Sequence, residues 1–225
     1  MRAYPTCYAC SKSRVSMEHV PPRSFFPDSK DERGNYQYRS GLIEVPSCNE
    51  HNNGKSGDDF YALWHIAPLE GTGEAARLLE VALGRQLEHD VVHRKGRFSG
   101  MLLKEIREAD STSLRGEVNV ERMQRFIQSR ARGAFFFEKF KKLLVPLKVV
   151  TIGNDIRDRS KAERLRKQEV LFETKMSGAA RLGTHPECFE YSIREIGSEG
   201  VTLVRLVFFE AVTFWAYHYP GYRGA

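Results

Sequence analysis

Two short motifs decide the fold of the N-terminal part of the chain: residues 7–10 are Cys-Tyr-Ala-Cys, and residues 48–51 are Cys-Asn-Glu-His. Each motif puts two metal-binding side chains on one tight turn, as in zinc knuckles. Three sulfurs and one imidazole suit Zn²⁺, which binds four such ligands in a tetrahedron. A chance pair of Cys and His clusters is the alternative, but two pairs that bracket one segment favour zinc. We therefore predict a zinc site formed by Cys7, Cys10, Cys48 and His51.

The composition is that of an ordinary globular chain with a positive excess. Hydrophobic residues make up 41% and charged residues 28% of the 225 residues, enough to bury a core. The net charge of +6 favours polyanionic partners, although many basic proteins bind no nucleic acid. Because the chain has neither a long apolar run nor a signal-peptide core, we expect a cytoplasmic protein without membrane contact. The remaining cysteine, Cys188, is expected to be buried.

A second set of motifs lies between and after the two cysteine pairs. Residues 17–22 are Met-Glu-His-Val-Pro-Pro, and residues 51–56 are His-Asn-Asn-Gly-Lys-Ser. With the cysteine pairs, these motifs resemble the HNH endonuclease family. The stretches 18–25 and 52–56 also resemble the HNH nuclease domain of CRISPR effector proteins, which lack the zinc pairs. The resemblance covers about residues 5–58 and rests on several spacings in a fixed order.

The resemblance implies a metal-dependent endonuclease that hydrolyses phosphodiester bonds in DNA. His19 matches the general base of the family, and histidine side chains exchange protons near neutral pH. Glu18 and Asn52 match the ligands of a catalytic Mg²⁺ or Mn²⁺ ion, for which oxygen ligands are suited. Lys55 and Arg23 are expected to contact the nucleic acid. The zinc would be structural and would hold the hairpin of His19 against the helix of Asn52.

Two positions differ from the family pattern. The residue before the histidine is usually Asp, whereas this chain has Glu18, which has the same charge and one more methylene. The middle Asn of the family, which orients the catalytic histidine, corresponds here to Ile43. We therefore predict that another group, such as Glu44, orients His19.

The sequence leaves two alternative functions open. Ile43 in place of the middle Asn favours a non-catalytic zinc module that binds nucleic acid or a protein. The other alternative keeps the HNH chemistry but acts on RNA. HNH units often make single-strand nicks, so double-strand cleavage would require a homodimer or two encounters.

The fold class predicted is α+β, with two domains at 1–68 and 69–225. The first is the zinc-stabilised ββα-metal (HNH) unit, and the second is a helical segment followed by a C-terminal antiparallel sheet. In the first domain, residues 36–45 are expected to be extended, and a helix is expected to begin near Asn52 and to resume through Trp64.

The periodicity of the second domain predicts its elements. Apolar residues at steps of three and four predict helices over 72–93, 101–109 and 119–144. Asn119 is a good N-cap for the last of these helices, and Pro146 is expected to stop it. Runs of β-forming residues predict strands over 147–152, 189–196, 201–209 and 212–219.

Four further features have two interpretations each. His89 and His93 have a spacing that can bind metal, but without a third ligand we favour surface histidines. Asp58 and Asp59 are interpreted as charges at a helix N-terminus. The basic residues of the 119–144 helix and of 157–167 can contact phosphate or form a solvated face. The aromatic residues of the last strands are expected in the core, with a platform for stacking bases as the alternative.

Overall fold

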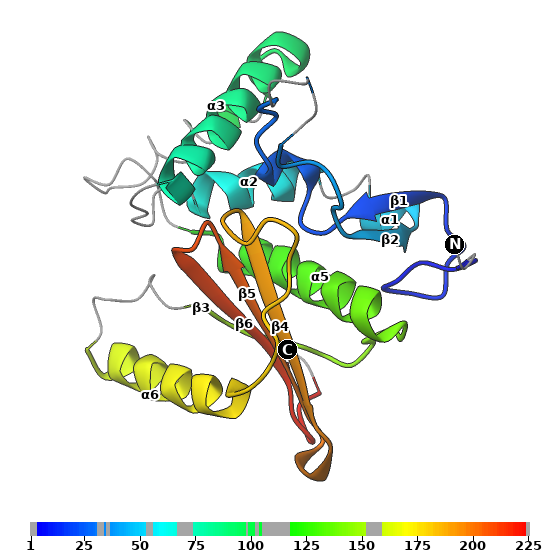
Figure 1. Cartoon of the computed structure of the whole chain (residues 1–225), viewed down its shortest axis with the longest axis vertical. Helices are drawn as coiled ribbons and strands as arrows, with labels where there is room; N and C mark the ends of the chain where they lie inside the picture. Colours follow the sequence, from blue (N-terminus) through cyan, green and yellow to red (C-terminus); the bar gives the residue numbers. More distant parts are fainter. Residues whose placement is uncertain are drawn as a thin grey trace.

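The computed structural model describes residues 4–30, 34, 37–52, 56–66, 74–97, 99–101, 104, 118–151 and 159–223. A four-stranded antiparallel sheet lies between helix α5 (Val120–Lys139) and helix α6 (Arg159–Met176), and α5 also contacts a small N-terminal hairpin (Figure 1). The fold therefore mixes helices with a C-terminal antiparallel sheet, as the α+β prediction requires. None of the described helices combines the length and the apolar character needed to span a bilayer.

The N-terminal hairpin has two short antiparallel strands, β1 (Ser16–His19) and β2 (Glu44–Ser47). A turn of 3-10 helix, η1 (Arg23–Phe25), follows β1. Helix α1 (Asn49–Asn52) begins directly after β2, and helix α2 (Ser56–Ile66) comes next along the chain. The order strand, strand, helix is the one that the motifs predict.

The second strand is shorter than the extended stretch predicted over 36–45. Residues 37–41 form turns and bends instead. Gly41 has a φ of +65°, a left-handed conformation that ends a strand. Its carbonyl accepts a hydrogen bond of 2.7 Å from the hydroxyl of Thr184, which comes from the other end of the chain. This loop packs against a distant segment, and that contact replaces the strand pairing which the local sequence favours.

Helix α5 begins as predicted and ends early. The side chain of Asn119 caps its N-terminus by accepting a hydrogen bond of 3.0 Å from the backbone N–H of Arg122. The helix ends at Lys139 because Phe140 adopts a left-handed conformation with a φ of 53°. The helix predicted over 119–144 is therefore five residues too long, and it ends before Pro146 is reached.

Two further helices complete the described helical part. Helix α3 (Glu74–Arg94) matches the prediction over 72–93 and packs against η1 and α2. The helix predicted over 101–109 lies mostly outside the described residues. Helix α6 begins two residues inside the charged run 157–167 and extends beyond it, so most of this run is helical.

The sheet matches the strands predicted from alternation. Its strands are β3 (Lys148–Thr151), β4 (Phe189–Ile196), β5 (Val201–Phe208) and β6 (Val212–His218), in the spatial order β3-β6-β5-β4. All neighbouring pairs are antiparallel. A short 3-10 helix, η3 (Gly197–Glu199), connects β4 to β5.

Hydrophobic cores lie on both faces of the sheet, because side chains alternate along each strand. Val204 belongs to the core under α5, whereas its neighbour Leu203 belongs to the core under α6. The core under α5 continues into the N-terminal unit through Phe25. The segments 1–68 and 69–225 therefore share one core, and their independence as domains stays a prediction.

Candidate metal centre and adjoining histidine

The two cysteine pairs converge on one point next to the hairpin. The ligand atoms of Cys7, Cys10, Cys48 and His51 all lie within 4.8 Å of one another. Sγ of Cys10 is 3.8 Å from Sγ of Cys48. Nδ1 of His51 is 3.2 Å from Sγ of Cys48 and 3.6 Å from Sγ of Cys10. These four side chains lie close enough to hold one metal ion.

The geometry and the donor set of this cluster fit zinc. Bonds of about 2.3 Å to sulfur and about 2.0 Å to nitrogen put tetrahedral ligand atoms roughly 3.5 to 3.8 Å apart. Burial alone would raise the pKa of Cys48, but hydrogen bonds from the backbone of His51 and with the thiol of Cys10 lower it. A lowered pKa favours the thiolate form that binds the metal. With four protein ligands, such a site has no position left open for a substrate.

The segment after α5 is hydrogen-bonded to the zinc-binding turn. Nζ of Lys142 donates to the carbonyl oxygen of Cys10 at 2.7 Å and to the hydroxyl of Thr6 at 2.8 Å. The metal cluster is therefore connected both to the hairpin that follows it and to the long helix.

His19 is the last residue of β1 and lies opposite Glu44 of β2. Nε2 of the imidazole is 3.6 Å from Oε1 of Glu44, and the side chain of His19 is 31% exposed. Nδ1 is buried and has no hydrogen-bond partner among the described residues. A buried ring nitrogen without a protein partner is uncommon, and a water or substrate group can reach this nitrogen only after the ring or its surroundings move.

Glu18 faces the opposite side of the hairpin, because successive side chains of a strand alternate. It is only 7% exposed. Its Oε1 is 2.9 Å from Nη2 of Arg130, and its Oε2 accepts a hydrogen bond of 3.1 Å from the hydroxyl of Ser47. The hydroxyl of Tyr8 is a third donor, and burial together with this carboxylate raises the pKa of Tyr8. Since a carboxylate offers about four lone-pair sites, three donors leave room for one more ligand contact.

Arg130 is fully buried in α5 and donates to several groups at once. Its Nη1 donates to the backbone carbonyl of His19 at 3.2 Å. Its Nη2 also contacts Oδ1 of Asp59 at 3.3 Å, and its Nε donates to the hydroxyl of Ser129 at 3.1 Å. Desolvation would lower the pKa of Arg130, but the carboxylates of Asp59 and Glu18 raise it. The guanidinium therefore stays charged inside the protein.

Asn52 lies on the Glu18 side of the hairpin. Its Nδ2 donates to the hydroxyl of Ser16 at 2.7 Å, and Ser16 shares a strand face with Glu18. This bond orients the amide and leaves Oδ1 for a ligand. Arg23 is exposed at the start of η1, whereas Lys55 lies outside the described residues. The structure thus brings Glu18 and Asn52 to one face of β1 and His19 to the other.

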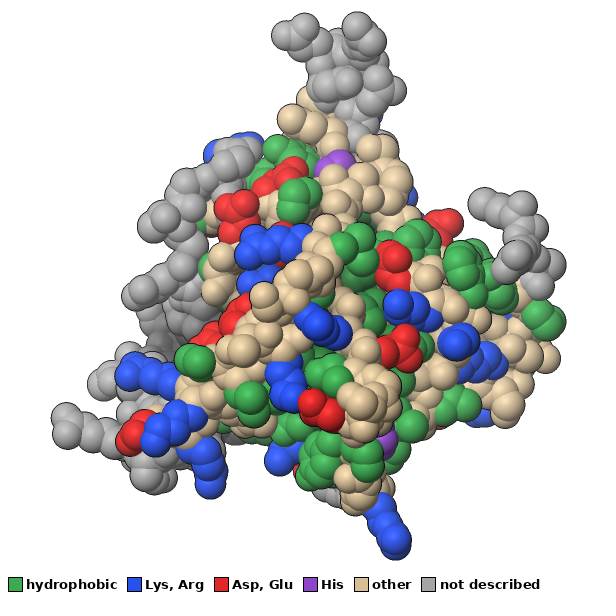
Figure 2. Space-filling view, turned by 60° about the horizontal axis from the view of Figure 1, so that its bottom comes forward, with side chains coloured by type: hydrophobic (Ala, Val, Ile, Leu, Met, Phe, Trp, Pro, Cys, Tyr) green, Lys and Arg blue, Asp and Glu red, His purple; other side chains and the backbone are tan. Residues whose placement is uncertain are grey.

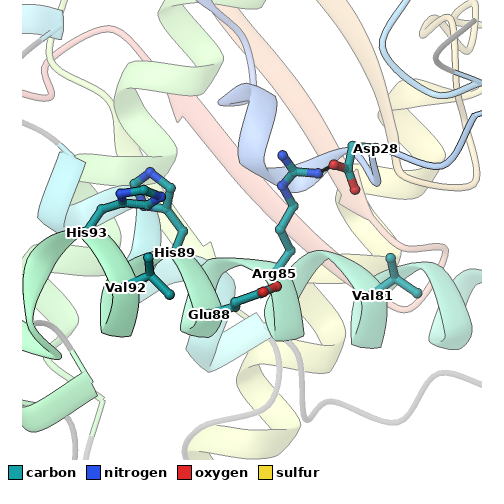
Figure 3. Close-up of a pocket in the computed structure, with 7 residues that line it drawn as sticks. All are labelled: Asp28, Val81, Arg85, Glu88, His89, Val92 and His93. Carbon is teal, nitrogen blue, oxygen red and sulfur yellow. Dashed lines mark ion pairs between the residues drawn. The ribbon is translucent and has the colours of Figure 1, made fainter.

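The pair His89 and His93 lies apart from this region, on α3. Figure 3 shows the two rings side by side on the wall of an open pocket of about 560 Å³, with the ion pair of Asp28 and Arg85 beside them. Within the described part of the chain, the Cys/His cluster is the one group of three or more side chains that can hold a metal ion. The interpretation of His89 and His93 as surface histidines is therefore kept.

The basic residues of α5 are not a single phosphate-binding stripe. Arg130 is 0% exposed, and Arg132 donates to the backbone carbonyl of Leu143 at 3.1 Å. Figure 2 shows basic side chains scattered among acidic and hydrophobic ones on one face of the molecule. The aromatic residues Phe208 and Trp215 of the sheet are buried, as a core requires.

No protein-family model, no curated protein and no solved structure matches the chain. The HNH resemblance therefore rests on the sequence motifs alone.

Two charged residues near the candidate site have roles that the sequence analysis does not predict. Arg130 belongs to the basic residues of the 119–144 helix, and Asp59 is interpreted there as a helix N-terminal charge. A signal for the burial of Arg130 does exist, because it lies seven residues after Met123 and four after Phe126, on the buried stripe of α5. No local signal distinguishes Asp59 from its neighbour Asp58.

Proposed function

We propose that the protein is a zinc-stabilised nuclease of the HNH type that hydrolyses phosphodiester bonds in DNA with His19 as its general base. The setting of His19 supports this most: Nε2 faces the carboxylate of Glu44, and Nδ1 has no partner among the described residues. A carboxylate that accepts the hydrogen of one ring nitrogen leaves the other nitrogen as the basic one. The distance of 3.6 Å is longer than a hydrogen bond, but such contacts are often loose before the substrate binds.

In this proposal, substrate binding uncovers the buried Nδ1 of His19, which then accepts a proton from the attacking water. The water oxygen bonds to phosphorus, the bond between phosphorus and the leaving sugar oxygen breaks, and that oxygen takes up a proton from solvent water. Glu44 stabilises the positive charge that forms on the imidazole. It thereby takes the role of the middle Asn, which Ile43 replaces.

The residues on the other face of β1 have oxygens that fit a hard cation. Glu18 would hold Mg²⁺ or Mn²⁺ with its remaining lone pair and Asn52 with Oδ1, and water would complete the coordination. Because His19 projects from the opposite face of β1, the scissile phosphate would have to meet both the ion and the base at the end of this strand, where the ion would neutralise its charge. Arg23 and Lys55 would contact neighbouring phosphates.

The non-catalytic zinc module is the second candidate. The three donors around Glu18 favour it, because they occupy most of the acceptor capacity of the expected metal ligand. This alternative predicts binding of nucleic acid or of a protein without cleavage.

Matched substrates separate these functions. The zinc-loaded protein is incubated with supercoiled plasmid, and with single-stranded DNA and RNA of one sequence, in EDTA, Mg²⁺ or Mn²⁺. Zinc content is measured after each incubation, so that loss of zinc to EDTA is recognised. Metal-dependent nicking of the plasmid supports the proposal, and cleavage restricted to RNA redirects it to RNA. Binding without cleavage in either metal eliminates the nuclease and supports the module.

A further inference from the structure

We infer that Arg130 of α5 is a positioning residue of the candidate nuclease site, so that the site is built from both halves of the chain. This inference rests on the proposed function. It concerns a residue outside the segment 5–58 that resembles the family.

Arg130 contacts both the proposed metal ligand, Glu18, and the proposed base, His19. Its guanidinium contacts the side chain of Glu18 at 2.9 Å and the backbone carbonyl of His19 at 3.2 Å. One planar group thereby fixes the orientation of the expected metal ligand and the path of the strand beneath the expected base. A guanidinium suits this task because its five donors have a rigid geometry.

The guanidinium of Arg130 also has contacts with residues outside the hairpin. Asp59 of α2 and Ser129 of α5 contact it at 3.3 Å and 3.1 Å, and it lies 5.1 Å from the centre of the Phe126 ring. Its side chain is 0% exposed, and so it has little room to move. Replacing a whole buried ion pair by apolar groups of similar volume is often neutral or stabilising, whereas removing one partner alone is strongly destabilising, so a buried pair is weak evidence for a purely stabilising role. The desolvation cost of burying it is consistent with a role in orienting Glu18.

The test uses three variants in the full chain. Arg130→Lys keeps the charge but loses the planar guanidinium, whose two terminal nitrogens contact Glu18 and His19 at the same time. Ser129→Ala removes one support of the guanidinium without changing any charge. Arg132→Lys is the matched control, because Arg132 is on the same helix and donates to the carbonyls of Leu143 and Val145 rather than to the hairpin.

The first readout is the affinity of the zinc-loaded protein for Mn²⁺, which is measured from the EPR signal of free Mn²⁺. The second is the Mn²⁺ concentration that gives half-maximal plasmid nicking. Zinc content and melting temperature report folding. We expect Mn²⁺ affinity to fall at least tenfold in Arg130→Lys and about threefold in Ser129→Ala, with Arg132→Lys equal to the wild type.

Three results overturn the inference, and they are distinguishable. If the wild type nicks DNA and both Arg130→Lys and Ser129→Ala keep its Mn²⁺ affinity, Arg130 is merely structural. If Arg130→Lys does not fold, unchanged Mn²⁺ affinity in Ser129→Ala likewise makes Arg130 merely structural. If the wild type itself neither binds Mn²⁺ nor nicks DNA, the proposed function fails, and the inference fails with it.

Discussion

Nε2 of His19 lies 3.6 Å from Oε1 of Glu44, its partner across the β1–β2 hairpin. At this distance the pair is an ion-pair contact and not a hydrogen bond. In the proposed nuclease, Glu44 would orient His19 in place of the middle Asn, one position later in the chain than Ile43.

Replacing Glu44 therefore tests whether its carboxylate assists His19. Glu44→Gln keeps the shape of the side chain but removes the charge that would stabilise the protonated imidazole. We expect plasmid nicking to slow by about tenfold to a hundredfold, the size of effect found for partners of catalytic groups. The nicking rate in Mn²⁺ measures it.

The matched control for this variant is Glu50→Gln. Glu50 is an exposed carboxylate of α1 that pairs with Lys12, away from His19. The Glu50→Gln protein should nick plasmid at the wild-type rate. Wild-type nicking by a folded Glu44→Gln protein would remove Glu44 from the mechanism.

The metal cluster is predicted to stabilise the fold. Cys48→Ser removes one ligand, so we expect loss of the single zinc equivalent per chain. The free energy of unfolding should fall by several kcal/mol, and the melting temperature by roughly 10 °C. Metal analysis and thermal unfolding measure both changes.

Cys188→Ala is the control for the loss of a thiol. Cys188 is buried but lies outside the metal cluster. This variant should retain one zinc ion. Equal zinc content in Cys48→Ser and the wild type would contradict the proposed ligand set.

The close approach of α5 to the end of β1 gives a prediction about packing. A Cβ at Gly133 would lie 2.6 Å from Cγ2 of Val20. Gly133→Ala should therefore destabilise the protein by about 1–3 kcal/mol despite the better helix propensity of alanine. Urea unfolding measures the difference, and adding Val20→Ala should restore part of the loss.

Gly84→Ala provides the contrast within the same experiment. Gly84 is in α3, and a Cβ there would have no neighbour within 4 Å. Alanine should stabilise this helix by about 0.5–1 kcal/mol. If Gly133→Ala stabilises the protein as Gly84→Ala is expected to, the close contact at Val20 is not significant.

Glu169 of α6 gives a prediction about pH. Burial and the neighbouring carboxylate of Glu173 raise its pKa, and Arg205 opposes them in part. Between the unfolded and folded pKa values the folded chain binds more protons, so the free energy of unfolding falls as pH rises through that window. Glu169→Gln should match the wild type in acid and become more stable than it towards neutral pH.

Urea unfolding at several pH values checks this sign. Glu163→Gln, which removes another carboxylate from α6, controls for the change in net charge. A Glu169→Gln protein that is less stable than the wild type at neutral pH would contradict the unfavourable setting of this carboxyl group.

The sequence predicts the elements that depend on residues a few positions apart. The strands β4, β5 and β6 alternate, and the Cys7 and Cys48 motifs have the spacing of zinc ligands. Their geometry depends on neighbours in sequence, which is why the sheet and the metal cluster match expectation.

Features that depend on distant contacts were not predictable. Residues 37–41 of the stretch predicted to be extended form turns and bends, and Gly41 contacts Thr184, 143 positions away. Arg130 meets the carbonyl of His19, 111 positions away. The helical stripe indicates that this arginine is buried, but no local pattern indicates which groups it contacts.

The most direct test of the proposed nuclease is the rate of plasmid nicking by the wild type and by His19→Ala, at equal zinc content and in the presence of Mn²⁺. We predict nicking by the wild type and a loss of at least about a hundredfold in the variant, because the variant lacks the proposed base. Nicking at the wild-type rate by a folded, zinc-loaded His19→Ala protein would contradict the assignment of His19 as the general base.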